Sequence, residues 1–199
     1  MASYSWQRVA SRILIAYLRQ TRLQRGKWHL LHLAAGFLVV EVEPGVIIRI
    51  ADPDDAAERH IVFGHTEQKE IDQFMSLAKP GMTFFDVGAN IGLYSLLAAN
   101  RVGLEGQVHA FEPTPALVGK LKMLLDLNSF QNVTVNEIAV SDQSGTAQFF
   151  LAEESVNNSF GSVSDRAITV SIVSVSPDLT AENEALTNSL RTLNLIANW

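Results

Sequence analysis

The residues that could do chemistry are concentrated in one short stretch, residues 84–92, which reads FFDVGANIG. An apolar run ends at Asp86, and Gly88 and Gly92 then bracket a tight turn before a second apolar run. A buried strand that enters a glycine turn and then a helix is typical of half a nucleotide-binding unit. A carboxylate at the entrance would repel a diphosphate, but it suits a ligand that carries an ammonium or a sulfonium.

Two further acids follow later strands at the same relative position. Glu112 comes 20 residues after Gly92, where a carboxylate can accept hydrogen bonds from both hydroxyls of a ribose. Asp142 follows a third apolar run and could accept from the exocyclic amine of adenine. Because ligands of open parallel sheets bind beyond the carboxyl ends of the strands, we expect these acids to converge on one site.

Three interpretations of this site remain open. A dinucleotide site would normally read Gly-x-Gly-x-x-Gly, yet position 90 is Asn90. S-adenosylmethionine has no phosphate and brings an ammonium, a sulfonium and a ribose diol, so the residues favour it. The alternatives are an NAD-dependent oxidoreductase and a non-catalytic nucleotide-fold binding or assembly module.

The elements that must position these residues alternate regularly. We predict strands at 82–87, 107–112 and 133–139 and helices at 91–101 and 114–128, preceded by a helix at 66–78. This order implies a parallel sheet with right-handed crossovers. Beyond Gly145, alternating strands are expected at 146–151 and 168–175, with a polar loop at 153–165 and a helical beginning to 178–198.

The N-terminal part is predicted as an extension, residues 1–65, ahead of the domain at 66–199 that contains the predicted parallel sheet. A helix at 5–24 carries Trp6, Val9, Ile13 and Tyr17 at spacings of three and four. It is read as a packing helix flanked by arginines, with a helix lying on a membrane surface as the alternative. A β-hairpin is expected at 37–42 and 46–50, and a loop at 51–65.

The amino-acid composition limits which class of protein this chain can be and which partners it can bind. The 199 residues are 47% apolar and 18% charged, and the absence of cysteine excludes disulfides and thiolate metal sites. Residues 1–40 hold six Lys/Arg and no acid, whereas 41–199 carry a net charge of −12. Such an acidic body argues against a nucleic-acid partner. We expect a cytoplasmic protein without a metal, whose basic helix contacts a membrane at most peripherally.

The motifs KPGMTFFDVGANIGLYSLLAA (79–99), VHAFEPTP (108–115) and AVSD (139–142) resemble the FkbM family of S-adenosylmethionine-dependent methyltransferases. The resemblance is strongest from 64 to 161. It implies a class I Rossmann-like parallel sheet with helices on both faces, and O-methylation of a small-molecule or glycan hydroxyl. It also implies a cofactor pocket made of Asp86, Gly88, Ala89, Asn90, Gly92, Glu112 and Asp142, with Glu67 and Glu70 beside it.

The same resemblance predicts that the sheet is incomplete in its C-terminal half. Family members continue into a strand ending in an Ile-Asp-x-Glu-Gly motif, which is absent here. We therefore expect a truncated chain with weak or absent transfer, whose open sheet edge allows self-association. No catalytic residue can be assigned from the sequence; His65 is the first candidate for a general base, ahead of His60 and the mid-strand His109.

Overall fold

The computed structural model describes residues 5–20, 24–63, 68–141, 144–151 and 167–174. At its centre lies a parallel sheet of β3 (Thr83–Val87), β4 (Gln107–Phe111) and β5 (Val133–Asn136), in that spatial order. Asp86 is level with Ala110 across the first pair of strands, so the carboxyl ends of β3 and β4 coincide. The predicted parallel order is confirmed, and the fold is a class I Rossmann-like α/β fold.

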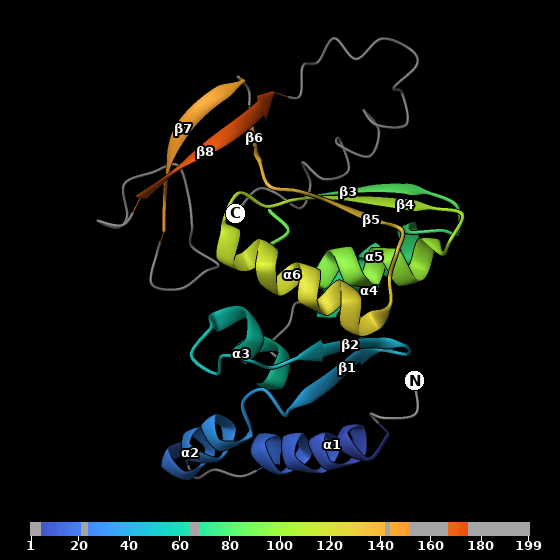
Figure 1. Cartoon of the computed structure of the whole chain (residues 1–199). Coiled ribbons are helices and arrows are strands. Elements are labelled where there is room, and N and C mark those ends of the chain that lie inside the picture. The colour runs from blue at the N-terminus through green and yellow to red at the C-terminus, as the bar shows by residue number, and fades with distance from the viewer. Residues whose placement is uncertain (1–4, 21–23, 64–67, 142–143, 152–166, 175–199) are drawn as a thin grey trace.

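Three helices cover one face of this sheet: α4 (Gln68–Leu77), α5 (Leu93–Val102) and α6 (Pro115–Asn128) (Figure 1). Phe84 points toward them and stacks edge-on against Phe74 of α4. On the other face Phe85 stacks on His109, which keeps that histidine in the sheet as predicted. No helix among the described residues lies on this second face, so the helices expected there stay a prediction.

The third predicted strand, 133–139, is wrong as a single element. After β5 the chain leaves the central sheet, and β6 (Ala139–Ser141) pairs in parallel with β8 (Ala167–Ser174). β7 (Gly145–Phe150) pairs antiparallel with β8, which confirms the two alternating strands. The side-chain amide of Asn136 donates to the carbonyl of Ala110, so the end of β5 is tied to β4 while the chain turns away.

The N-terminal part forms further layers below these helices (Figure 1). It comprises α1 (Ser5–Gln20), α2 (Gln24–Ala34), the hairpin β1 (Val39–Glu43) and β2 (Val46–Arg49), and α3 (Ala56–Phe63). The hairpin is confirmed, with Gly45 at a φ of 87° in its turn. The loop predicted at 51–65 is wrong, because α3 occupies most of it. Its N-cap Asp55 accepts from the N–H of Glu58.

The hydrophobic core runs without a break from the N-terminal part into the sheet domain. It joins Leu18 of α1 and Ile48 of β2 to Leu121 of α6 and Ala110 of β4. The side-chain amide of Asn128 extends this contact, because it both accepts from the N–H of Ile47 and donates to its carbonyl. The N-terminal part is therefore packed as part of one structure, and the boundary at residue 65 stays a prediction.

Helix α1 packs through a different face from the one the sequence suggested. Its buried side chains are Ile15 and Leu18, together with Gln7 and Ser11, and the hydroxyl of Ser11 accepts from the N–H of Val39. The stripe read as the packing face, Trp6, Val9, Ile13 and Tyr17, is between 50 and 67% exposed. That interpretation of the stripe is wrong, since the helix has a second apolar face that competes for the core. None of the helices described is long and apolar enough to cross a membrane.

Candidate functional site

The turn between β3 and α5 is held by the end of β4. The N–H groups of Gly88 and Ala89 both donate to the carbonyl of Phe111, at 2.9 and 3.0 Å. Gly88, Asn90 and Gly92 all have positive φ, at 78°, 53° and 94°. Asparagine is one of the few residues with a side chain that adopts this conformation readily. Its Oδ1 also accepts from the N–H of Ile91 at 2.7 Å, which explains why position 90 tolerates a residue other than glycine.

The two outer glycines of the turn are required for different reasons. A Cβ on Gly92 would lie 2.2 Å from Cδ1 of Leu121, so α6 packs directly against the start of α5 there. A Cβ on Gly88 would meet no heavy atom within 4 Å, apart from its chain neighbours. Gly88 is therefore needed for its backbone conformation, and its exposed backbone leaves room for a ligand to approach.

Asp86 is a buried carboxylate at the end of β3, only 7% exposed. Its Oδ2 accepts from the hydroxyl of Ser95 on α5 at 2.6 Å. Burial raises the pKa of Asp86 from 3.8 to about 6, against the lowering effect of hydrogen bonds from Ser95, and the nearby charge of Glu112 raises it further. The negative charge of Asp86 is thus held in an unfavourable place, which a cation bound nearby would relieve.

Glu112 is 4% exposed and has a task that the sequence did not reveal. One carboxylate oxygen accepts from the N–H of Asn90 and the other from the N–H of Thr114, both at 2.9 Å. It therefore ties the glycine turn to the start of α6. Each oxygen keeps a further lone pair, so Glu112 can accept from a ligand hydroxyl in addition to these bonds.

Unsatisfied groups around these acids fit a cationic ligand that also carries hydroxyls. Within the described ranges, neither Asp86 nor Glu112 forms an ion pair with a lysine or an arginine. Thr114 sits at the N-cap of α6 as predicted, yet its buried hydroxyl finds no hydrogen-bond partner among the described residues and caps none of the N–H groups of α6. The site thus offers two buried carboxylates without a counter-cation and one hydroxyl without a partner. S-adenosylmethionine carries groups that would satisfy them, since its ammonium and sulfonium are cationic and its ribose brings hydroxyls.

The remaining predicted site residues are placed only in part. Glu70 lies half-buried in the first turn of α4. Glu67, Asp142 and His65 fall outside the described residues. His60 is an exposed residue of α3. In the part of the chain that the structure describes, no three His, Asp or Glu residues are grouped to hold a metal ion.

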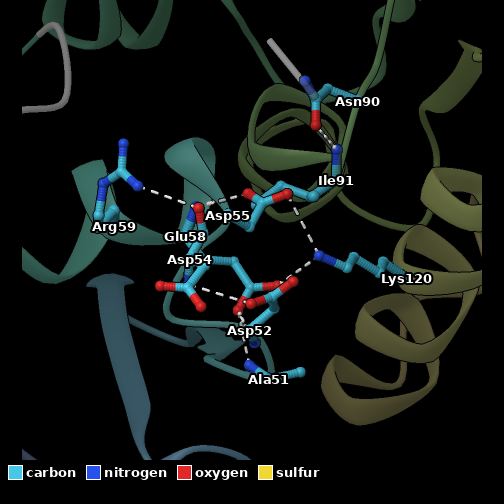
Figure 2. A network of polar contacts seen from close by, with 9 residues as sticks. All are labelled: Ala51, Asp52, Asp54, Asp55, Glu58, Arg59, Asn90, Ile91 and Lys120. Carbon is cyan, nitrogen blue, oxygen red and sulfur yellow. Dashed lines mark hydrogen bonds and ion pairs between the residues drawn. The ribbon is translucent and has the colours of Figure 1, made fainter. Parts of the chain in front are cut away.

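A second polar cluster, which sequence reasoning missed, joins α3 to α6 (Figure 2). Lys120 of α6 donates to the carboxylates of Glu58, at 2.9 Å, and Asp55, at 3.3 Å. The other oxygen of Glu58 accepts from the N–H groups of Ala51 and Asp52. Burial would lower the pKa of Lys120, but the two carboxylates outweigh it and raise that pKa above its ordinary value. Lys120 and Glu58 are 62 residues apart in the sequence, so the pattern of neighbouring residues does not indicate that they meet.

Class I methyltransferases have a Rossmann-like parallel sheet with a glycine turn after its first strand. One acid lies at the end of that strand and another at the end of the next, and Asp86 and Glu112 occupy these two positions here. Residues 86–187 match the sequence model of the methyltransferase FkbM domain, which is half of the chain. The chain belongs to the FkbM methyltransferase family, a family of S-adenosylmethionine-dependent enzymes, and the expected resemblance is confirmed.

Solved methyltransferase structures show local similarity to this chain. A putative rRNA-methylase from Clostridium thermocellum is 26% identical over 36% of this chain and 39% of its own, with a TM-score of 0.34. A SAM-dependent methyltransferase from Aquifex aeolicus is 28% identical over 35% and 36%, with a TM-score of 0.31. TYW2 of P. horikoshii, in complex with MeSAdo, is 24% identical over 51% and 36%, with a TM-score of 0.41. The chain thus spans less than two fifths of the length of each. No curated protein matches it.

Proposed function

We propose that this chain binds S-adenosylmethionine at the turn between β3 and α5, and that the methyl transfer it supports, expected to be weak, is to the hydroxyl of a small molecule or sugar. The observation that carries the proposal is the pair Asp86 and Glu112, both buried and neither paired with a lysine or arginine among the described residues. Asp86 takes the cationic amino-acid end of the cofactor. Glu112 takes the ribose hydroxyls.

The glycine turn supports the proposal because it is already ordered by the protein itself. The carbonyl of Phe111 and the carboxylate of Glu112 together accept from three successive N–H groups, those of Gly88, Ala89 and Asn90. The conformational entropy of the turn is therefore lost when the chain folds and not when a ligand binds, which favours tight binding. Sequence resemblance adds Ala89 and Asp142 to the pocket, with Glu67 and Glu70 beside it.

When bound, the cofactor supplies an electrophilic methyl group on a sulfonium. The task left to the protein is to hold the acceptor oxygen in line with that methyl and to keep water away. A general base would assist an alcohol acceptor, and His65 stays the predicted candidate. Support for a small-molecule or glycan acceptor comes from the family resemblance and from the acidic body, which is unsuited to binding phosphate backbones.

Calorimetric titration of the full chain with S-adenosylhomocysteine tests the cofactor proposal. We expect micromolar binding that weakens tenfold or more in Asp86→Ala and in Glu112→Ala. Glu105→Ala, which removes an exposed carboxylate from the loop before β4, is the matched control and should bind like the unmodified chain. No heat from a folded chain, or preference for NADH, would reject the proposal.

Transfer is tested separately with S-adenosylmethionine labelled in the methyl group. The acceptors to offer are a panel of sugars and hydroxylated small molecules, with RNA as the competing class. Label in a sugar or small molecule supports O-methylation. Label in RNA alone, or binding without any transfer, rejects hydroxyl methylation by this chain and leaves cofactor binding standing.

A further inference from the structure

The outer face of α1 carries an apolar stripe that stays at least half exposed in the folded chain. The stripe consists of Trp6, Val9, Ile13 and Tyr17, each at least half exposed. Since these are large residues, each leaves on the order of 100 Å² in solvent, and four in line make a patch as large as the largest on a typical monomer. The helix is anchored through its opposite face by Ile15 and Leu18, so the stripe is not a consequence of loose packing.

The stripe is part of a wider outer layer. Helices α1 and α2 lie together at the end of the molecule farthest from the central sheet (Figure 1). Leu33 of α2 is 70% exposed, and Phe37, 40% exposed, contacts the ring of Trp6 in a tilted arrangement with the ring centroids 5.3 Å apart. A surface with aromatic and aliphatic side chains gathered on one outer layer is suited to contact with something apolar.

The charge around the stripe is net positive, although the carboxylates of Glu41 and Asp54 also reach this layer. Arg8 and Arg12 both approach the carboxylate of Glu41, at 3.7 and 2.6 Å, so two cations share one anion. Arg12 is still 72% exposed at its side chain. Arg19 donates to the backbone carbonyls of Ile61 and Val62, which carry no net charge. With no acid anywhere in residues 1–40, this layer is positive while the rest of the chain carries −12.

We propose that the α1–α2 layer docks on an anionic lipid bilayer, with the stripe of Trp6, Val9, Ile13 and Tyr17 inserted at the level of the headgroups. An apolar stripe bordered by arginines on a helix that lies flat is the arrangement of interfacial helices. Basic residues near an anionic surface add an electrostatic attraction that salt screens. A second copy of the chain fits less well, because its own positive layer would face this one.

The experiment is co-sedimentation of the full chain with vesicles of phosphatidylcholine containing 30% phosphatidylserine, compared with pure phosphatidylcholine. The charged vesicles should bring down the chain and the neutral ones should not. Raising NaCl from 0.15 to 0.5 M should weaken binding several-fold as the Debye length shortens. Ile13→Glu should weaken binding at least tenfold, because it places a charge among inserted apolar groups.

The matched control is Leu104→Glu, which adds the same charge at a residue that is 88% exposed in the loop after α5. It should sediment like the unmodified chain, and both variants should keep the unmodified melting temperature, since neither position is buried. The proposal is overturned if the chain stays in solution with charged vesicles, or if Ile13→Glu binds as well as Leu104→Glu. A stable dimer in light scattering that Ile13→Glu dissociates would instead assign the stripe to a second copy.

Discussion

Replacing Asp86 by asparagine should stabilise the empty protein while removing its affinity for the cofactor. The folded state holds this carboxylate at a pKa of about 6, against 3.8 in the unfolded chain, mainly because burial removes water from its charge. An acid whose pKa rises on folding favours the folded state at low pH, and this stabilisation is lost as pH rises through the folded pKa. The neutral amide in Asp86→Asn would resemble the protonated acid at every pH.

The magnitude follows from the size of the shift. A difference of about 2 pKa units makes the charged carboxylate cost about 3 kcal/mol at pH 8, and about 1 kcal/mol at pH 4.5, which is only slightly above the pKa of the unfolded chain. Urea denaturation of Asp86→Asn should therefore show a gain in unfolding free energy of about 3 kcal/mol at pH 8 and about 1 kcal/mol at pH 4.5. Affinity for S-adenosylhomocysteine at pH 8 should fall tenfold or more.

Ser95 provides the internal check on this reasoning. Its hydroxyl and its N–H both lower the pKa of Asp86, and only the hydroxyl bond is lost in Ser95→Ala. That variant should therefore lose stability at pH 8 and recover more of it on acidification than the unmodified chain does. The reasoning is refuted if Asp86→Asn is less stable than the unmodified chain at pH 8, or if its change in stability is the same at both pH values.

Two further variants test how α6 is held. Lys120→Met leaves Glu58 buried without its cation and should lower the unfolding free energy by about 3 kcal/mol. The control Lys122→Met removes an exposed ion pair and should cost less than about 1 kcal/mol. Equal losses of unfolding free energy in urea denaturation would contradict the buried role of Lys120. Gly92→Ala puts a Cβ against Leu121 at a φ of 94° and should lower the unfolding free energy by about 3 kcal/mol. A melting temperature within a few degrees of that of the unmodified chain would contradict this expectation and show that α6 shifts without cost.

Much of the central fold could be predicted because its signals are local. The apolar run before Asp86, the glycines after it and the Thr114-Pro115 start of α6 each act over a few residues, and each is found where the sequence placed it. The acids at the ends of β3 and β4 also follow from strand order alone, since parallel strands share one carboxyl edge.

The failures share one physical cause, which is that the deciding partner lies far away in sequence. Helix α3 looks like a polar loop until Lys120 neutralises Glu58 and Asp55. The two apolar faces of α1 cannot be ranked without the hairpin that selects Ile15 and Leu18 for the core. Glu112 looked free to bind a ligand because nothing local shows that the N–H groups of Asn90 and Thr114 point at it.

The bonds of Glu112 also explain how the chain can keep Asp86 charged and buried. A buried carboxylate that costs about 3 kcal/mol would be expected to distort its surroundings or to draw in a lysine. Here the turn beside it is fixed from β4, by the carbonyl of Phe111 and the carboxylate of Glu112, so it does not depend on Asp86 for its shape. The free-energy cost of the buried charge is offset by contacts elsewhere in the fold, namely the shared hydrophobic core and the ion pairs between Lys120 and α3. The site is consequently ordered before any ligand arrives, and its one unfavourable feature is a negative charge that a cationic ligand neutralises.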